Sequence, residues 1–223
     1  MDRNAEAVKQ MQEGNIEEAA KLLNDAIEEN PSDAVAFTNF GNLLAAVGEE
    51  DRAAVFFEKA AEIDHSIGTA HYGLGNIYYN KEEFKKAVDA YQEALAQGLI
   101  QGDVYYMLGM SFFQGGDFVR ALPHLSRAAE LNPEDKDAAF HYGLALAQAE
   151  EIDEAMKQFN AVLKLDEEHA DSYFNLGVGY AYKQDAEQAL DMFNKALEIQ
   201  PEHSLSANGK KQMEKILSGE MEE

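Results

Sequence analysis

The stretch "YFNLGVGYAYKQDAEQAL" (residues 173–190) decides the fold, because it places Gly177 inside a pattern that is otherwise typical of a helix. A glycine in the middle of a helix costs about 1 kcal/mol relative to alanine, so it needs a compensating role. Ala189 follows this glycine by twelve residues. The same pair recurs along the chain every 34 residues, as from Gly143 to Gly177 (177 − 143 = 34), so the sequence is an array of repeats.

Three positions of the repeat keep their size in every copy. The first is Gly41, Gly75, Gly109, Gly143 or Gly177, with Ala7 in the first copy, and the second is Ala19, Ala53, Ala87, Ala121, Ala155 or Ala189. A large residue follows each alanine by four: Leu23, Phe57, Tyr91, Leu125, Phe159 and Phe193. Small residues let two helices approach closely, and overpacking such a contact costs about 1–3 kcal/mol. The pattern therefore predicts a pair of closely packed helices in each repeat.

In the last repeat the motif consists of Tyr173, Leu176, Gly177, Tyr180, Ala189, Phe193, Ala196 and Pro201. This motif resembles the tetratricopeptide repeat (TPR) family, in particular its small stand-alone bacterial scaffold proteins. The resemblance implies an all-α fold: a right-handed α-solenoid of six TPR helix-turn-helix units plus a C-terminal capping helix. It divides one solenoid domain, 1–217, into units at about 1–33, 34–67, 68–101, 102–135, 136–169 and 170–203, with the capping helix at about 204–217. Residues 218–223 are expected to form a disordered tail.

Three departures from the motif predict local differences. The first helix of the first repeat carries Arg3, Glu6 and Gln10 where apolar residues are expected, so it should be short, frayed or solvent-facing. The segment "AQGLIQGD" (residues 96–103) lacks the usual proline, so the turn between repeats three and four should bend differently. In the capping helix, one face is expected to hold the apolar residues Leu205, Met213, Ile216 and Leu217.

The composition is strongly acidic, with 42 Asp and Glu against 18 Lys and Arg and a formal net charge of −24. Such a surface repels nucleic acid and anionic membranes and favours basic partners. The chain has no cysteine, so it has neither disulfides nor thiolate chemistry. Its start lacks the layout of a signal peptide, and no apolar run approaches the ~20 residues that span a bilayer. A cytoplasmic protein is therefore expected.

Catalysis finds no support in the sequence. No two of the six histidines are three to five residues apart, as a metal-binding pair on a helix requires. No glycine-rich phosphate loop follows a strand, and the many carboxylates suit a solvated surface better than paired acid–base chemistry. We therefore expect no enzyme activity, no cofactor and no metal.

The first helix of each repeat has a second face that packing inside the repeat does not explain. The resemblance implies that this face lines a concave groove. Its fifth position carries an aromatic residue in four consecutive repeats: Tyr72, Tyr106, Phe140 and Phe174. An exposed apolar strip of this kind usually marks a binding surface. The alternative is that these rings pack between neighbouring first helices.

Polar residues on the same face suggest hydrogen bonding and charge selection. Asn42 and Asn76 occupy the position from which many TPR domains hold an extended peptide, although either could be an ordinary solvated residue. The second position carries Asp103, Asp137 and Asp171 in three consecutive repeats. These carboxylates either form a rim that selects a cationic ligand or simply favour the helix N-termini.

The complete candidate site is the peptide-binding groove. Its residues are Asn42, Tyr72, Asn76, Tyr79, Asn80, Asp103, Tyr106, Met107, Met110, Phe113, Gln114, Asp137, Phe140, His141, Leu144, Phe174, Asn175, Val178 and Tyr182. No Lys or Arg stands at the second, fifth, sixth, ninth, twelfth or thirteenth position of any repeat. The TPR domains that grip an acidic C-terminal tail need basic residues there, so such a tail is not an expected ligand.

These patterns predict a non-catalytic protein–protein interaction scaffold. Its expected ligand is a neutral-to-basic, partly apolar peptide segment, with no nucleic acid and no membrane among its partners. The alternative is a self-assembling structural protein that uses its groove or cap to contact further copies. The sequence does not identify the partner, because a fold does not fix a function.

Overall fold

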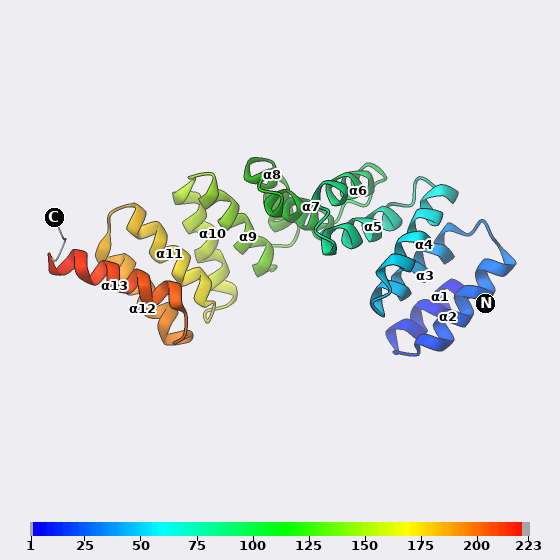
Figure 1. The fold of residues 1–223 in the computed structure, drawn as a ribbon, viewed down its shortest axis with the longest axis horizontal. Coiled ribbons are helices and arrows are strands. Elements are labelled where there is room, and N and C mark those ends of the chain that lie inside the picture. Colours follow the sequence, from blue (N-terminus) through cyan, green and yellow to red (C-terminus); the bar gives the residue numbers. More distant parts are fainter. Residues whose placement is uncertain (1, 220–223) are drawn as a thin grey trace. The chain divides into compact units, whose positions relative to one another are not determined.

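The computed structural model describes residues 2–219, and that range contains thirteen α-helices and no strand (Figure 1). Odd-numbered helices up to α11 are the first helices of the six repeats, and even-numbered helices are the second ones. The bounds are α1 (Arg3–Gln12), α2 (Ile16–Glu29), α3 (Ala34–Ala46), α4 (Glu50–Ile63), α5 (Gly68–Asn80), α6 (Phe84–Ala96), α7 (Gly102–Gln114), α8 (Phe118–Leu131), α9 (Lys136–Gln148), α10 (Ile152–Leu165), α11 (Ala170–Tyr182), α12 (Ala186–Ile199) and α13 (Ser204–Ser218). The predicted all-α repeat fold is confirmed.

The chain divides into two compact parts, Met1–Gly116 with α1 to α7 and Asp117–Glu223 with α8 to α13. We call them the N-terminal part and the C-terminal part and describe each by itself. Within each part, every helix packs against the next one along the chain. The single solenoid domain expected over residues 1–217 stays a prediction.

Gly177 has the packing role that its position predicts. A Cβ atom added to Gly177 of α11 would lie 2.6 Å from the ring of Phe193 in α12. One added to Gly209 of α13 would also lie 2.6 Å from that ring. Phe193 therefore fits between two glycines, one in its own repeat and one in the element that follows. The close contact on both sides compensates for the poor helix propensity of glycine.

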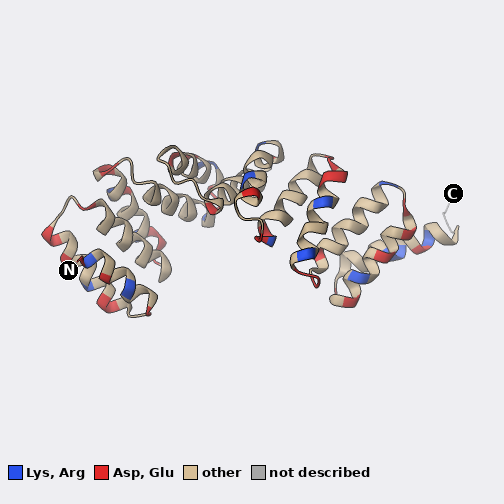
Figure 2. Cartoon of the chain, turned by 180° about the vertical axis from the view of Figure 1, so that it is seen from behind, with Lys and Arg blue, Asp and Glu red and all other residues tan. Residues whose placement is uncertain are grey.

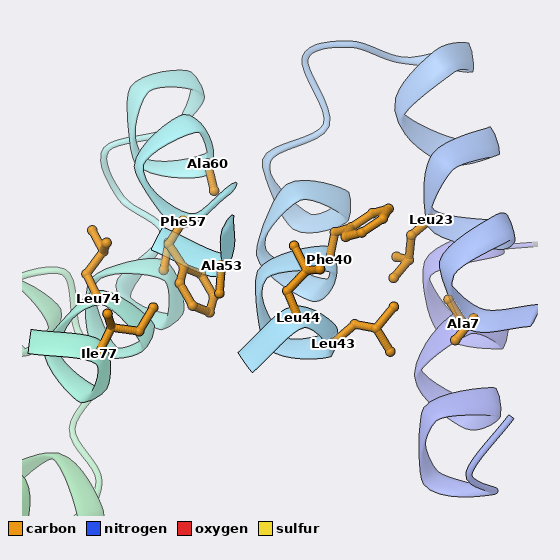
Figure 3. Packing of buried hydrophobic residues seen from close by; sticks show 12 residues of the cluster. Ala7, Leu23, Phe40, Leu43, Leu44, Ala53, Phe57, Ala60, Leu74 and Ile77 are labelled. Atoms are coloured by element: carbon orange, nitrogen blue, oxygen red, sulfur yellow. The ribbon is translucent and has the colours of Figure 1, made fainter. Parts of the chain in front are cut away.

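Phe57 of α4 is held in the same way in the N-terminal part. Its ring would lie 2.6 Å from a Cβ at Gly41 of α3 and 2.5 Å from one at Gly73 of α5. Figure 3 shows this ring beside Leu74 and Ile77 of α5. The ring thus links its own repeat to the next, so the core is continuous across the boundary between these repeats.

The first helix is short, as predicted. α1 has 10 residues, whereas the first helices of the later repeats have 13. Asp2 caps its N-terminus by accepting hydrogen bonds from the backbone N–H groups of Asn4 and Ala5. Only Ala7 of this helix is buried, because the remaining side chains of α1 include the polar residues that break the motif.

The turn between repeats three and four differs from the others in this part, as expected. α6 ends at Ala96, and Gly98 adopts a left-handed conformation with φ of 86°. The N–H of Leu99 then donates to the carbonyl of Ala94 at 3.0 Å. The turn after α4 instead passes through Asp64, whose backbone is extended. A glycine at residue 98 therefore replaces the extended residue of the ordinary turn.

Only one of the four residues on the expected apolar face of α13 is buried. Met213 is buried, but Leu205, Ile216 and Leu217 are exposed by 58%, 46% and 46%. The buried face is formed by Ser206 and Met213 around Gly209, because the ring of Phe193 fills the space against that glycine. The helix extends to Ser218, one residue into the expected tail, and residues 220–223 lie outside the described residues.

Candidate functional site

The first helices form the inner layer of each part. In the N-terminal part α1, α3, α5 and α7 pack successively against one another, and in the C-terminal part α11 packs against α13. The successive second helices of either part do not come as close to each other. The N-terminal part therefore curves toward its first helices, and the C-terminal part does so where α11 meets α13. We call the second, fifth, sixth, ninth, twelfth and thirteenth positions of the first helices, and of α13 in the same register, the groove positions. The sixth position is not exposed in every helix, because Gly73 of α5 and Gly209 of α13 pack against the ring of Phe57 or Phe193.

The aromatic residues at the fifth position pack against neighbouring helices and also keep part of their surface. The Phe140 ring lies 5.8 Å from Phe159 and 4.8 Å from His169, measured between ring centroids. Phe174 lies 5.9 Å from Phe193 and 5.2 Å from His203. Each ring thus contacts the second helix of its own repeat and the residue that begins the next first helix. Both rings are half-buried.

Tyr72 belongs to a polar cluster rather than to a purely apolar contact. The buried Tyr91 hydroxyl donates to Asn76 Oδ1 at 2.7 Å, and the Tyr72 and Tyr91 rings lie 5.7 Å apart. Burial raises the pKa of the Tyr72 hydroxyl, a hydrogen bond with Asn76 opposes this rise, and the Asp103 carboxylate adds to it. Tyr72, Asn76 and Asp103, all predicted site residues, are therefore brought together.

The other candidate asparagines differ in how much of their amide is already used. Asn80 Nδ2 donates to Glu50 Oε1 at 2.7 Å, and Asn175 Nδ2 donates to the Asp171 carbonyl at 2.8 Å. Asn42 is exposed on α3. Their side chains are thus not equivalent donors for a peptide.

The candidate aspartates are exposed, and one of them contacts a histidine that sequence reasoning missed. His203 Nε2 lies 3.0 Å from Asp171 Oδ1, and His203 Nδ1 accepts the backbone N–H of Ser206 at 3.0 Å. His169 likewise accepts the N–H of Ser172 at 3.1 Å. Both histidines therefore cap helices. The capping role could have been predicted from the position in the repeat, because Asp33 and Asp135, which cap α3 and α9, stand at the same position.

The remaining candidates range from buried to exposed side chains. Met110 is buried and has little surface to offer a ligand, whereas Tyr79, Met107, Phe113, His141 and Leu144 are half-buried and Gln114 is exposed. Val178 and Tyr182 of α11 are the most exposed of the apolar candidates, at 45% and 63%. Eleven of the nineteen candidates, Asn42 to Gln114, lie in the N-terminal part, and the other eight lie in the C-terminal part.

Several basic side chains in the described range are held by carboxylates of a neighbouring repeat. Lys81 pairs with Asp51 at 2.5 Å, and Lys183 pairs with Asp153 at 2.5 Å. In both pairs a residue that follows a first helix reaches back to the second helix of the preceding repeat. Figure 2 shows acidic and basic residues on helices of both parts, and the sequence carries 42 Asp and Glu against 18 Lys and Arg.

Residues 2–219 also bear on metal sites and membrane spans. None of these residues forms a group of three or more His, Asp or Glu side chains placed to hold a metal ion. No helix in the same range combines the length and the apolar character that crossing a membrane requires.

Comparison with known proteins places the chain in a family. Two family models, both described as tetratricopeptide repeat, match residues 4–66, 69–97, 106–166 and 170–203. The chain therefore belongs to the tetratricopeptide repeat family, whose members mediate protein–protein interactions. The TPR repeat-containing protein YrrB of Bacillus subtilis is 54% identical over 39 residues, an alignment that spans 18% of this chain and only 19% of that relative.

Solved structures agree with this assignment over a greater length. The crystal structure of YrrB, described as a TPR protein with an unusual peptide-binding site, has a TM-score of 0.84 and 47% identity and covers 86% of this chain and 99% of that one. The structure of MamA (TM-score 0.68, 23% identity) covers 74% of this chain and 96% of that one. Pseudomonas aeruginosa pilF (TM-score 0.76, 18% identity) covers 94% and 96%. The last two likenesses show the fold alone.

Proposed function

We propose that this chain is a non-catalytic scaffold that binds an extended, neutral-to-basic and partly apolar peptide segment of another protein on its first-helix layer. The observation that carries the proposal is the exposed apolar surface of Val178 and Tyr182 on α11, a helix that also carries the exposed carboxylate of Asp171. No Lys or Arg stands at the groove positions of the six repeats. Exposed apolar surface rimmed by polar groups is typical of interaction sites.

The packing of the aromatic rings refines the role of each residue. Phe140 and Phe174 contact the helices around them, so they shape the floor of the surface and also support the fold. Val178 and Tyr182, which are more exposed, supply the apolar contact. In the N-terminal part, Asn42 and the Tyr72–Asn76 cluster offer hydrogen-bonding groups to a peptide backbone.

The charge of the protein selects the partner. A net charge of −24 raises the local concentration of cationic segments and repels nucleic acid, anionic membranes and acidic C-terminal tails. It also opposes close association of two copies of the chain, and the outward residues Lys211 and Glu214 of α13 are exposed and charged. These features support a peptide partner over self-assembly.

A matched pair of valine variants tests the proposed function. A phage-displayed library of random peptides is panned on the protein, and the best binder is synthesised with a fluorescent label for anisotropy titration. Val178→Ser should weaken this peptide by about 1 kcal/mol, roughly fivefold in Kd, because part of the valine side chain becomes buried on binding. Val119→Ser, on the second helix α8 and 73% exposed, should leave Kd unchanged.

Two outcomes would contradict the proposal. If no peptide is enriched over an unrelated acidic protein, peptide binding is not the function. If Val119→Ser weakens binding and Val178→Ser does not, the peptide lies on the second-helix layer. Light scattering over a range of concentrations tests the alternative, since a mass that rises with concentration would favour self-assembly.

A further inference from the structure

The last helix, α13, has the packing face of a cap. Ser206 and Met213 are buried, and Gly209 accommodates the ring of Phe193 from α12. Terminal elements of a repeat array normally carry a polar outer face, because no further repeat covers them. Lys211 and Glu214 on α13 are exposed and fit that expectation.

Two exposed apolar residues of α13 do not belong to that polar face. Leu205 and Ile216 are exposed by 58% and 46%. In the repeat register they stand one full period after Asp171 and Tyr182 and therefore occupy the second and thirteenth groove positions. A cap that only shielded the array would have no need of apolar side chains at these positions.

The apolar residues of α13 share the register of the exposed residues of α11, and the two helices pack against each other. Ile216 and Tyr182 stand at the same position of their helices, and Val178 lies one turn before Tyr182 on α11. At the start of the two helices, His203 Nε2 lies 3.0 Å from Asp171 Oδ1, so Leu205, two residues after His203, stands close to Asp171, whose side chain is 60% exposed.

We propose that α13 is part of the binding site as well as a cap. Tyr182, Val178 and Ile216 hold one large apolar side chain of the bound segment, and Asp171 with Leu205 holds a Lys or Arg of the same segment. Leu205 covers the aliphatic stem of that cation, and Asp171 pairs with its charged end. This inference rests on the proposed peptide-binding function and adds its anchor site and the pattern of its ligand.

The helix geometry fixes the spacing of the two side chains in the ligand. Asp171 stands in the first turn of α11, and Tyr182 is the last residue of that helix. They are therefore about 16 Å apart along the helix axis. An extended segment that lies along α11 covers this length in about five residues. The peptides selected from the library should accordingly carry an aromatic or large aliphatic residue about five residues from a Lys or Arg.

Adjacent residues of α13 provide the matched test. Ile216 and Leu217 are both 46% exposed, but they point about 100° apart around the helix. Leu217 stands one full period after Lys183, whose side chain reaches Asp153 of a second helix, so this position faces away from the groove. With the selected peptide as the probe, Ile216→Ser should weaken binding at least tenfold. Leu217→Ser should change it less than twofold, with unchanged circular dichroism for both variants.

The charged contact is tested with the conservative variant Asp171→Asn, which keeps an oxygen for His203. It should weaken the selected peptide severalfold, and the loss should vanish when the peptide's Lys or Arg is replaced by Gln. If Ile216→Ser binds like the wild type while Val178→Ser is impaired, α13 is not part of the site and the proposed function stands. If Leu217→Ser binds the peptide as weakly as Ile216→Ser does, the lost affinity comes from a disturbed capping helix and the inference is wrong. If no peptide is enriched at all, both proposals are wrong.

Discussion

Three turns inside the repeats place a side chain where backbone geometry favours glycine. The turn between the two helices of a repeat needs a left-handed residue, and glycine supplies it in three repeats, at Gly14, Gly48 and Gly116, with φ near 80°. The other three use Glu82, Glu150 and Gln184, with φ of 59°, 62° and 61°. A left-handed conformation costs a residue with a Cβ about 1–2 kcal/mol. These three turns are therefore strained relative to their equivalents.

A reciprocal exchange at this position should change stability in opposite directions. Gly48→Gln should lower the free energy of unfolding by about 1 kcal/mol, because the space is open but the backbone conformation is unfavourable. Gln184→Gly should raise it by about 0.5 kcal/mol, since the relief of strain exceeds the entropy that glycine loses on folding. Urea denaturation followed by circular dichroism measures both.

A glycine placed in ordinary helical backbone serves as the control for this exchange. Gln148→Gly, at the exposed end of α9, should lower stability, because no strain is relieved there. A stability gain in Gln148→Gly as large as in Gln184→Gly would show that the left-handed turn is not the cause.

At the scale of single helices, two histidines take the place of the usual capping aspartate. His203 uses Nδ1 to accept the backbone N–H of Ser206 in the first turn of α13 and Nε2 to contact Asp171 of α11. Its ring also packs on Phe174. One side chain thus caps the last helix and attaches it to the preceding first helix.

Removal of the His203 side chain, which caps the N-terminus of α13, should loosen this helix selectively. His203→Ala should cost about 1 kcal/mol, because a backbone N–H at the helix start loses its acceptor. His203→Asn should retain most of the stability, since an amide oxygen can take the place of Nδ1. Hydrogen exchange of the α13 amides measures the loss, and faster exchange in α9 to the same extent would contradict a local effect.

The order and type of the helices could be predicted from the sequence because size and spacing repeat together. Gly177, Ala189 and Phe193 have counterparts in nearly every repeat, so a chance match at one position does not mislead. The turn at Gly98 and the short α1 were also predictable, since each departs from the shared pattern.

The surface of α13 and the contacts of the aromatic rings were harder to predict. The expected apolar face treats α13 as an isolated amphipathic helix, whereas the structure places it in the register of a first helix. That register would have put Leu205 and Ile216 at groove positions. The partial burial of Phe140 depends on His169, the last residue of the same repeat, which caps the next first helix, and the repeat motif does not include that position.

Over the whole molecule, the acidic surface sets the conditions for association. With 42 acidic and 18 basic residues, the surface attracts cationic segments over distances comparable to the Debye length, about 8 Å at physiological ionic strength. Attraction of this kind mainly accelerates encounter and has less effect on the lifetime of a complex.

The association rate of the selected peptide should therefore depend on salt. Between 10 mM and 150 mM NaCl the association rate constant should fall by about fivefold, with a smaller change in the dissociation rate constant. Stopped-flow fluorescence measures both constants. A peptide of the same length in which each Lys and Arg is Gln is the control, and an equal salt dependence for that peptide would contradict electrostatic attraction.

The rings held between two glycines have a consequence for the history of the chain. Phe57 and Phe193 each touch a glycine of their own repeat and a glycine of the following element. The glycine of the ring's own repeat recurs in the same register along the chain, whereas the position of Gly73 and Gly209 carries Met107, His141 and Asn175 in other repeats. A duplicated or deleted block of one period therefore keeps the contact inside each repeat. The contact across the new junction is recreated only where the element that follows begins like α5 or α13, so the gene can be shortened or lengthened without compensating substitutions at few of its junctions.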